Sequence, residues 1–359
     1  MAEDGRVFVR GMTSEDYSLK DWRKRQLAVP RVRDAKGEDH GSIAGEGGYS
    51  GYGDASVPGA TNSDRGITTW DHIEPGDDPF LTQTLNVYFH DFPAQSSNRG
   101  HGHQNEAGFY VLGGKGYEIH DDQRYDWKKG DFFVVHTDSV HRHFNPYDEP
   151  AKIMIVKAKA TWMFMGLIQQ GKSYNPFKDE EGRFGEREDW SQIWTPGVLD
   201  RMKVVPGDET PFQMTPLGKV KTFSSPEKTD VRMFSVDAFE WEIPAGSRSG
   251  KIWKMADEIL HVVSGSGYSL HWEVEAEIDD KYYARIAKEP TRHDFKAGDT
   301  LYVPQNTVTQ HFSNDGEPLL LFSGQNRVFK HLGYDNVHVF EAAPEYEGAE
   351  VKTGATARV

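Results

Sequence analysis

The sequence predicts an all-β protein with two similar barrels in tandem, an extended N-terminal arm and a short, partly helical connector. From about residue 85, short strand patterns alternate with turn residues, and many such strands at close spacing favour a barrel or a sandwich. The second half of the chain also repeats the first. A histidine cluster occurs in the first half only, so we expect one of the two barrels to carry the chemistry.

Length and composition narrow the class of protein. A chain of 359 residues is long enough for two domains, and 36% hydrophobic residues are enough for real cores. The formal net charge of −15 argues against binding to nucleic acid, because a phosphate backbone would be repelled. The chain has no cysteine, so disulfides, thiolate nucleophiles and cysteine metal sites are excluded. An acidic N-terminus without a long apolar run predicts a cytoplasmic protein that does not contact membranes.

The arm is expected to span residues 1–80. It begins with a predicted short helix, for which Ser14 is a suitable N-cap. Residues 34–62 are rich in glycine, serine, alanine and aspartate and cannot bury enough surface to fold alone. Two interpretations stay open: a flexible arm, or an arm that orders on its own barrel or on a partner subunit through Tyr49 and Tyr52.

The remaining boundaries follow the strand patterns. We expect the first barrel at residues 81–165 and a second, degenerate barrel at residues 231–345, followed by a tail at 346–359. Between the barrels, residues 166–230 lose the strand pattern and include a charged, loop-like stretch. This region is therefore interpreted as the connector, with one helix in it.

The internal repeat has a fixed offset. Pro93-Ala94 recurs 151 residues later as Pro244-Ala245, and Gly130-Asp131 recurs 168 residues later as Gly298-Asp299. The change in offset places an insertion in the second copy, around residues 273–290. Self-similarity of this kind predicts two equivalent structural units.

Three histidines of the first copy have the pattern of a metal site. His101 and His103 are two residues apart, so on a strand their side chains point to the same face. His141 follows about forty residues later and needs only a neighbouring strand to join them. Neutral imidazole is a common metal ligand, and three imidazoles on one wall make an open metal site.

With these residues in place, the chain resembles the two-barrel cupin proteins. The first cupin motif contains a His-x-His pair followed by a glycine, and the second contains a glycine, a histidine and an asparagine. The residues that match these motifs are His101, His103, Gly114, Gly130, His141 and Asn145. The resemblance covers about residues 85–160 and 234–330 and implies the fold more firmly than the activity, because fold alone does not determine function.

The sequence departs from the cupin motifs in two places. His136 and Asp138 replace a proline and a glycine of the second motif. The glutamate of the first motif is replaced by Ala107, and the neighbouring Glu106 lies on the opposite strand face unless a bulge turns it inward. The resemblance then implies a site of three histidines without a carboxylate, as in the gentisate-type ring-cleaving dioxygenases.

The second copy lacks the predicted ligands. Ile252 and Lys254 stand at the His-x-His positions, and Thr309 stands at the position of the third histidine. Glu258 occupies the glutamate position, but alone it cannot hold a metal. We expect the second barrel to stabilise the first and to offer a dimer face.

His136, His143 and Gln104 are the candidate catalytic residues, and each also has a structural interpretation. His136 is either a pocket acid–base group or a substituted loop residue. His143 shares a strand face with the third ligand, but it recurs in the second copy, which also fits a buried structural histidine. Gln104 could form a hydrogen bond to a ligand near the metal, although on a regular strand its side chain would point away from the histidines. His120 recurs as His271 and is interpreted as structural or exposed.

The resemblance implies a metal-dependent dioxygenase. Its N-terminal barrel would bind Fe(II), with Mn, Ni and Zn as alternatives. A small anionic substrate, hydroxylated aromatic or enolic, would chelate the metal beside O2, and the protein would form a homodimer or a higher homo-oligomer. A non-oxidative isomerase, lyase or hydrolase, and a non-catalytic binding or storage protein, remain the alternatives.

Overall fold

The computed structural model describes most of both barrels. The described residues are 31–33, 68–73, 82, 84–98, 101–120, 123–137, 139–165, 170–172 and 201–348. The predicted helix after Ser14, the anchors Tyr49 and Tyr52, and Asp138 lie outside them.

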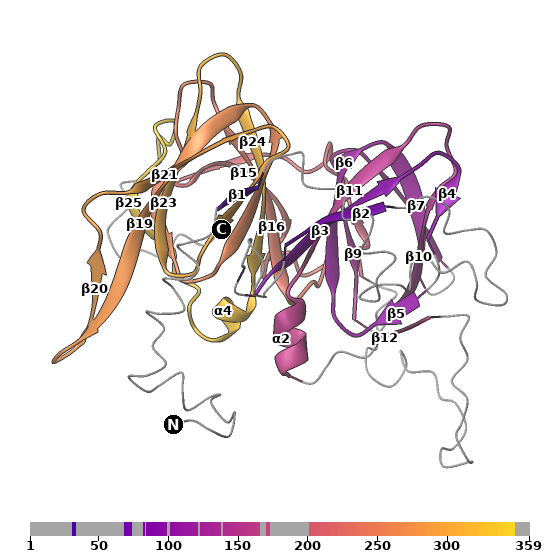
Figure 1. Ribbon diagram of the computed structural model, residues 1–359, viewed down its shortest axis with the longest axis horizontal. Helices are drawn as coiled ribbons and strands as arrows, with labels where there is room; N and C mark the ends of the chain where they lie inside the picture. Colours follow the sequence, from indigo (N-terminus) through magenta and orange to yellow (C-terminus); the bar gives the residue numbers. More distant parts are fainter. Residues whose placement is uncertain are drawn as a thin grey trace, which may run out of the picture.

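The first barrel is formed by two facing six-stranded sheets (Figure 1). One sheet has the order β12-β5-β10-β7-β8, with β4 paired to β10. Its strands are β4 (Ser96–Ser97), β5 (His101–His103), β7 (Lys115–His120), β8 (Gln123–Lys128), β10 (Ser139–Asn145) and β12 (Gln170–Lys172). The other sheet has the order β13-β9-β6-β11-β3-β2. Its strands are β2 (Thr68–Ile73), β3 (Asn86–Phe92), β6 (Ala107–Gly113), β9 (Phe132–Val135), β11 (Ala151–Lys157) and β13 (Val204–Val205).

The second barrel repeats this arrangement. Its larger sheet has the order β1-β22-β18-β24-β16-β15-β14. These strands are β1 (Val32–Arg33), β14 (Gln213–Thr215), β15 (Gly218–Ser224), β16 (Val236–Ile243), β18 (Glu258–Ser264), β22 (Thr300–Val303) and β24 (Leu319–Asn326). The facing sheet has the order β20-β19-β23-β17-β25, with β21 paired to β19. Its strands are β17 (Lys251–Lys254), β19 (Ser266–Ile278), β20 (Tyr282–Ile286), β21 (Thr291–Lys296), β23 (Thr307–Ser313) and β25 (His338–Glu341).

Helices are short in the described part of the chain. They are α2 (Lys159–Phe164), which follows β11, and α4 (Val328–His331), which follows β24. None of the described helices has the length and apolarity needed to cross a membrane. The all-β prediction with two tandem barrels is confirmed.

The repeat inferred from sequence is visible in the strand register. Val156 pairs with Gly108 in the first barrel, and Gly324 pairs with Ile259 at the equivalent place in the second. The repeated glycine, Gly116 in the first copy, has a steric reason. A Cβ atom there would lie 2.4 Å from the carbonyl oxygen of Phe144, and the equivalent contact at Gly267 would be 1.9 Å.

The insertion in the second copy forms a hairpin. β19 is 13 residues long and continues past the barrel to pair with β20. This hairpin projects from the second barrel (Figure 1). The change of offset in the sequence therefore reflects one added β-ribbon and leaves the barrel strands equivalent.

Segments outside the two repeats add edge strands to the barrels. β1, from the N-terminal arm, pairs with β22 of the second barrel, and β13, from the connector, pairs with β9 of the first. The neighbouring Arg31 is 5% exposed and bonds the ring of His271 at 2.7 Å and the carboxylate of Glu273 at 2.8 Å. Both added strands cover sheet edges that would otherwise expose unpaired backbone groups.

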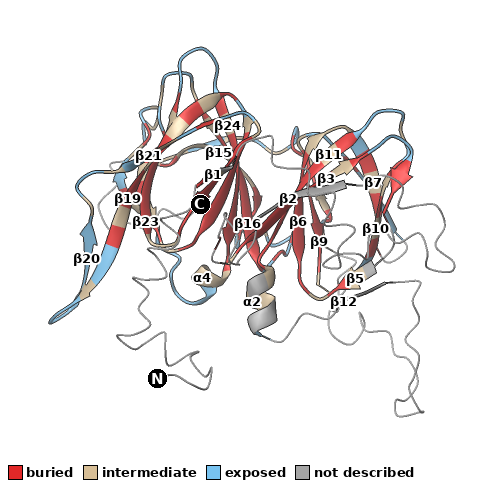
Figure 2. Ribbon diagram, viewed as in Figure 1, coloured by how far each residue is buried: buried red, intermediate tan, exposed pale blue. Residues whose placement is uncertain are grey.

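The two barrels share one hydrophobic core at their junction. Figure 2 shows buried strands facing each other between the barrels. Tyr110 and Phe132 from the first barrel and Phe322 from the second belong to the same buried cluster, and the rings of Tyr110 and Phe322 stack at 4.4 Å. Each such side chain contributes about 1.5–3 kcal/mol when it is fully buried. We therefore expect the barrels to unfold together. Each barrel also has an interior cluster of its own.

Candidate metal centre

Three adjacent strands of the first barrel bring histidines into one row. β10 lies between β5 and β7, and the Cα of His141 is paired with that of His101 on one side and that of His120 on the other. The buried positions of β10 alternate, which is typical of a strand with one face toward a core. Two of the three predicted ligands, His101 and His141, are thus opposite each other in register.

The rings of His103 and His141 lie together inside the barrel. Their centroids are 4.9 Å apart, and the residues are 4% and 2% exposed. The Nδ1 of His141 is 3.2 Å from the carbonyl oxygen of Ser139. In the neutral imidazole this places the proton on Nδ1, so that the lone pair of Nε2 is available as a ligand.

The third predicted ligand is only partly described. The backbone of His101 belongs to β5, whereas its side chain lies outside the described part of the structure. Among the side chains that are described, no three histidine, aspartate or glutamate groups are arranged closely enough to hold a metal ion. The described geometry therefore supplies two imidazoles of the triad and, in register, the backbone position of the third.

A buried carboxylate, missed in the sequence, lies beside these rings. Glu118 on β7 is fully buried, with Oε1 2.9 Å from Nε2 of His120 and Oε2 3.2 Å from Nδ1 of His143. Burial raises the pKa of the Glu118 carboxyl, and the hydrogen bond from His143 opposes the rise. Because Glu118 and His120 are two residues apart on one strand, same-face parity was the signal that could have found them.

His143 lies at the inner side of the cluster. Its ring is 5.2 Å from that of His141 and also contacts the rings of Phe92, Phe109 and Phe133. The residue is 1% exposed. His143 thus lies between the predicted ligand His141 and the apolar barrel interior, and its contact with Glu118 suits the fixing of its ring orientation.

The His136 ring is held by residues of the connector and of the segment that follows it. Nζ of Lys203 donates to Nδ1 at 3.1 Å, and Nε2–H donates to the carbonyl oxygen of Val231 at 2.6 Å. Burial and the Lys203 charge lower the pKa of His136 to about 3. With both ring nitrogens engaged and the ring neutral, the position fits the loop interpretation and offers no acid–base group to a pocket near neutral pH.

Gln104 and Glu106 follow the His-x-His pair and lie in different surroundings. Gln104 is half-buried at the bend between β5 and β6. Glu106 is fully buried, and its Oε2 accepts hydrogen bonds from the backbone N–H groups of Phe234 and Ser235, both at 2.8 Å. Its bound carboxylate oxygen is therefore committed to the second half of the chain, while the motif position itself is Ala107.

Lys157 at the end of β11 is a second residue that the sequence analysis missed. It is 5% exposed, and burial together with the charge of Lys159 lowers its pKa to about 7. Ile153 and Ile155 belong to the interior cluster of the first barrel, and Lys157 continues their alternation. Its Nζ lies 5.3 Å from the ring centroid of Tyr88, another interior residue.

The second barrel shows where Lys157 sits relative to the motif. Gln325 is the equivalent of Lys157 in the repeat, and it pairs in register with Glu258, the equivalent of Ala107. The amide of Gln325 donates to the Glu258 carboxylate at 2.9 Å. By analogy with this pair, we expect the Lys157 side chain on the same strand face as Ala107.

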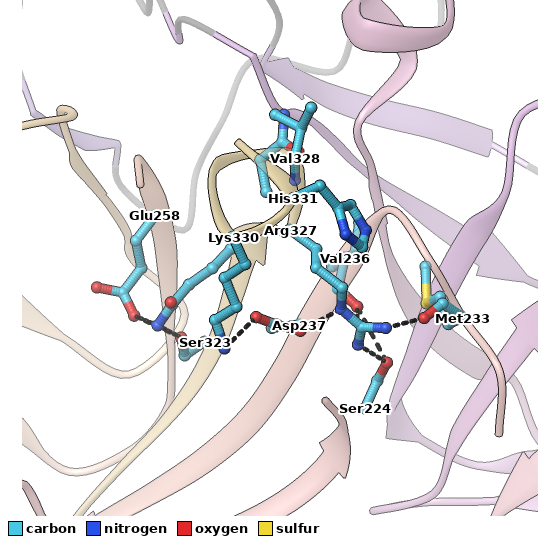
Figure 3. A network of polar contacts seen from close by, with 12 residues as sticks. Ser224, Met233, Val236, Asp237, Glu258, Ser323, Arg327, Val328, Lys330 and His331 are labelled. Carbon is cyan, nitrogen blue, oxygen red and sulfur yellow. Dashed lines mark hydrogen bonds and ion pairs between the residues drawn. The ribbon is translucent and has the colours of Figure 1, made fainter. Parts of the chain in front are cut away.

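At the metal position of the second barrel there is an ion pair instead of imidazoles. Nζ of Lys254, the equivalent of His103, is 2.5 Å from Oε2 of Glu258. The hydroxyl of Ser323 donates to the other carboxylate oxygen at 2.5 Å (Figure 3). Ile252 and Thr309 pair in register across β17 and β23, where the first barrel has His101 and His141.

Comparisons with known proteins agree with this architecture. Residues 88–157, from β3 to the end of β11, match the family model described as Cupin domain. No relative was found among curated protein sequences. Among solved structures, the salicylate 1,2-dioxygenase from Pseudaminobacter salicylatoxidans matches with a TM-score of 0.55 at 12% identity, over 74% of this chain and 77% of that chain. A variant of that enzyme in complex with gentisate matches with a TM-score of 0.59 at 13% identity, over 87% and 86%. At these identities the likeness is one of fold: the chain has the two-barrel cupin fold, with a cupin domain at residues 88–157.

Proposed function

We propose that the first barrel is a metal-dependent dioxygenase whose metal is held by His101, His103 and His141. The observation that carries the proposal is the pair of buried rings of His103 and His141, 4.9 Å apart on neighbouring strands, with His101 opposite His141 in register. Their donor set is chemically suited to a first-row divalent ion, and an open facial arrangement favours Fe(II). When bound, such an ion would supply redox chemistry with O2 and a point of chelation for the substrate.

Neutral ligands favour an anionic substrate. Three imidazoles leave the charge of a divalent ion uncompensated, and Ala107 stands where a glutamate would otherwise contribute a negative charge. The neighbouring Glu106 is bonded to the second half of the chain. The site therefore attracts a small acid.

The barrel interior supplies groups that recognise such an acid. The Lys157 ammonium would pair with a carboxylate of the substrate, and the Tyr88 ring beside it gives an aromatic wall. Glu118 would hold the rings of His120 and His143, and so fix the surroundings of His141. Gln104, at the bend after β5, remains a candidate for hydrogen bonding to the substrate.

The similar structures support the same class of substrate. One is named as acting on salicylate and another contains gentisate, and both molecules are hydroxylated aromatic acids. A hydroxylated aromatic acid offers a chelating oxygen pair, a carboxylate for Lys157 and a flat apolar ring. We therefore propose a hydroxylated aromatic or enolic acid as substrate and O2 as co-substrate.

The test is anaerobic reconstitution with Fe(II), followed by O2 uptake with a panel of hydroxylated aromatic acids that includes salicylate and gentisate. We expect uptake with at least one acid, and its loss in His103→Ala and His141→Ala. His338→Gln, on β25 of the second barrel, is the matched control and should retain activity.

Failure of Fe(II) to bind, or its binding with equal affinity in His141→Ala, would overturn the proposed site. Binding of metal without O2 uptake for any acid would overturn the dioxygenase. Turnover without O2 in protein loaded with Mn, Ni or Zn would instead establish a non-oxidative enzyme at the same site.

A further inference from the structure

The second barrel contains a cavity at the place equivalent to the candidate metal centre. Its volume is about 320 Å³, near the lower end of the range of small-molecule sites. Strands β16, β17 and β24 and the segment after α4 contribute to it. The lining residues used below are Leu217, Phe239, Trp241, Ile252, Lys254 and Lys330.

The innermost charged group of this cavity is an ammonium held in a fixed place. Lys254 is 5% exposed, and one of its three N–H donors bonds Glu258. Within the described residues, no other acceptor is bonded to this ammonium. As far as the described residues show, two N–H donors are therefore left for an acceptor that enters from the cavity.

The carboxylate beside Lys254 is already saturated with donors. Glu258 accepts hydrogen bonds from Lys254, from Ser323 at 2.5 Å and from Gln325 at 2.9 Å. Burial raises the pKa of Glu258, but the charge of Lys254 and the hydrogen bonds from Lys254 and Ser323 are among the effects that oppose it, and the net pKa is lowered. Glu258 thus orients the ammonium and has little capacity left to bind a ligand itself.

The other walls are apolar near the ammonium, and the mouth carries both basic and acidic side chains. Phe239, Trp241 and Ile252 are each no more than 2% exposed. At the mouth, Lys330 pairs with Asp237 at 2.7 Å, and Arg327 pairs with the same carboxylate (Figure 3). The acids at the mouth, Glu227 and Asp335, are solvent-exposed. Water therefore screens their charges more strongly than the charge of the buried ammonium.

We propose that the second barrel binds a small organic monocarboxylate with an apolar body, and that Lys254 holds its carboxylate where the first barrel has the predicted metal ligand His103. The ammonium replaces the metal as the cation that fixes the acid. Phe239, Trp241 and Ile252 contact the apolar body. Barrel two is thus a metal-free ligand site, and its occupancy stabilises the shared core through ordinary binding linkage.

The experiment is a 19F NMR titration of the full-length, metal-stripped protein with 4-fluorobenzoate. It is performed on the His141→Ala variant, so that the candidate metal centre cannot account for binding. We expect saturable binding, and a loss of at least about tenfold in affinity in the neutral pair variant Lys254→Met/Glu258→Gln, as one charge-assisted contact is removed.

A second variant keeps the ion pair and fills the cavity. Ile252→Phe should also weaken the binding of 4-fluorobenzoate. Far-ultraviolet circular dichroism checks that both variants are folded. 4-Fluorobenzyl alcohol has a similar body without the charge and should bind at least about tenfold more weakly than the acid.

Any of three results would overturn the proposal. They are no saturable binding of 4-fluorobenzoate at millimolar concentration, equal affinities for 4-fluorobenzoate and 4-fluorobenzyl alcohol, and an affinity for 4-fluorobenzoate that neither Lys254→Met/Glu258→Gln nor Ile252→Phe changes. Because the titration contains no metal, its outcome is separate from that of the O2-uptake experiment.

Discussion

The Glu106 carboxylate accepts a hydrogen bond from the backbone N–H of Ser235 at 2.8 Å and so joins the first barrel to the second. The repeat supplies the reciprocal contact. Asp257 is the equivalent of Glu106, and it accepts the backbone N–H of Thr84, the equivalent of Ser235, at 3.0 Å. An acid from each barrel therefore bonds the backbone just before an equivalent strand of the other barrel, β16 or β3, which gives the junction an approximate two-fold character.

Removal of either acid is expected to destabilise the whole chain. Glu106→Ala leaves the N–H groups of Phe234 and Ser235 without their carboxylate partner, at a cost of about 1–3 kcal/mol in the free energy of unfolding. Urea denaturation should show one transition shifted to lower denaturant. The exposed Glu149→Ala is the matched control and should change stability by less than about 0.5 kcal/mol. Two separated transitions in the wild-type protein would contradict the shared core.

Asp257 predicts a pH dependence of stability. Burial, opposed in part by the hydrogen bonds from Thr84, raises its pKa from 3.8 to about 6. Between these values the folded state binds more protons than the unfolded state, so this group's contribution to stability falls as the pH rises from about 4 to 6. Relative to wild type, Asp257→Asn should gain stability over that interval and stay level above it. Urea titrations of both proteins at several pH values measure the difference, and a difference that is constant with pH would refute the assignment.

Glu118 is expected to tune metal binding without being one of the three predicted ligands. Glu118→Gln keeps the size of the side chain but replaces the carboxyl group that His120 and His143 share as a partner. The affinity for Fe(II) should fall about 10–100-fold, the usual effect of changing a group that orients metal ligands. A competitive chelator assay measures the affinity, and the spectrum of the Co(II)-substituted protein should shift. An unchanged spectrum and affinity would assign Glu118 to the barrel core alone.

Lys157 predicts a pH dependence of substrate binding. Because its pKa is lowered to about 7 by burial, the ammonium is lost as the pH rises through neutrality, and the KM for an anionic substrate should then increase. Lys157→Met should raise KM about tenfold at pH 6 and abolish this dependence, with a smaller change in kcat. Lys115→Met, on the exposed start of β7, is the control. A KM that is independent of pH in wild type would separate Lys157 from the substrate.

The sequence predicted the barrels well because their signals are local and periodic. Strand alternation, turn glycines such as Gly116 and the repeated offset each report on residues that are close in the chain or equivalent between copies. The alternation of side chains along a strand likewise predicted that Glu106 does not point to the same face as the ligands of the first motif. Parity could also have placed Glu118 and Lys157 inside the barrel, but neither belongs to the motif that drew attention.

The role of His136 and the buried ammonium of Lys254 could not be read in this way. The partners of His136 are Lys203 and Val231, which are distant in sequence and belong to no repeated pattern. The partner of Lys254 is only four residues away, but whether that pair lies on the surface or at the floor of a cavity depends on the closure of the second barrel.

By itself, the sequence determined the class of fold, its duplication and the strand that presents His101 and His103, because strand period and repeat offset are properties of the chain alone. Only the tertiary structure decided which side chains share a desolvated space. It placed Glu118 between two imidazoles, Lys157 beside the ring of Tyr88 and Glu106 across the junction. The reason is physical: burial and long-range contacts set the charge and the partners of these groups, and both arise only when distant strands pack together.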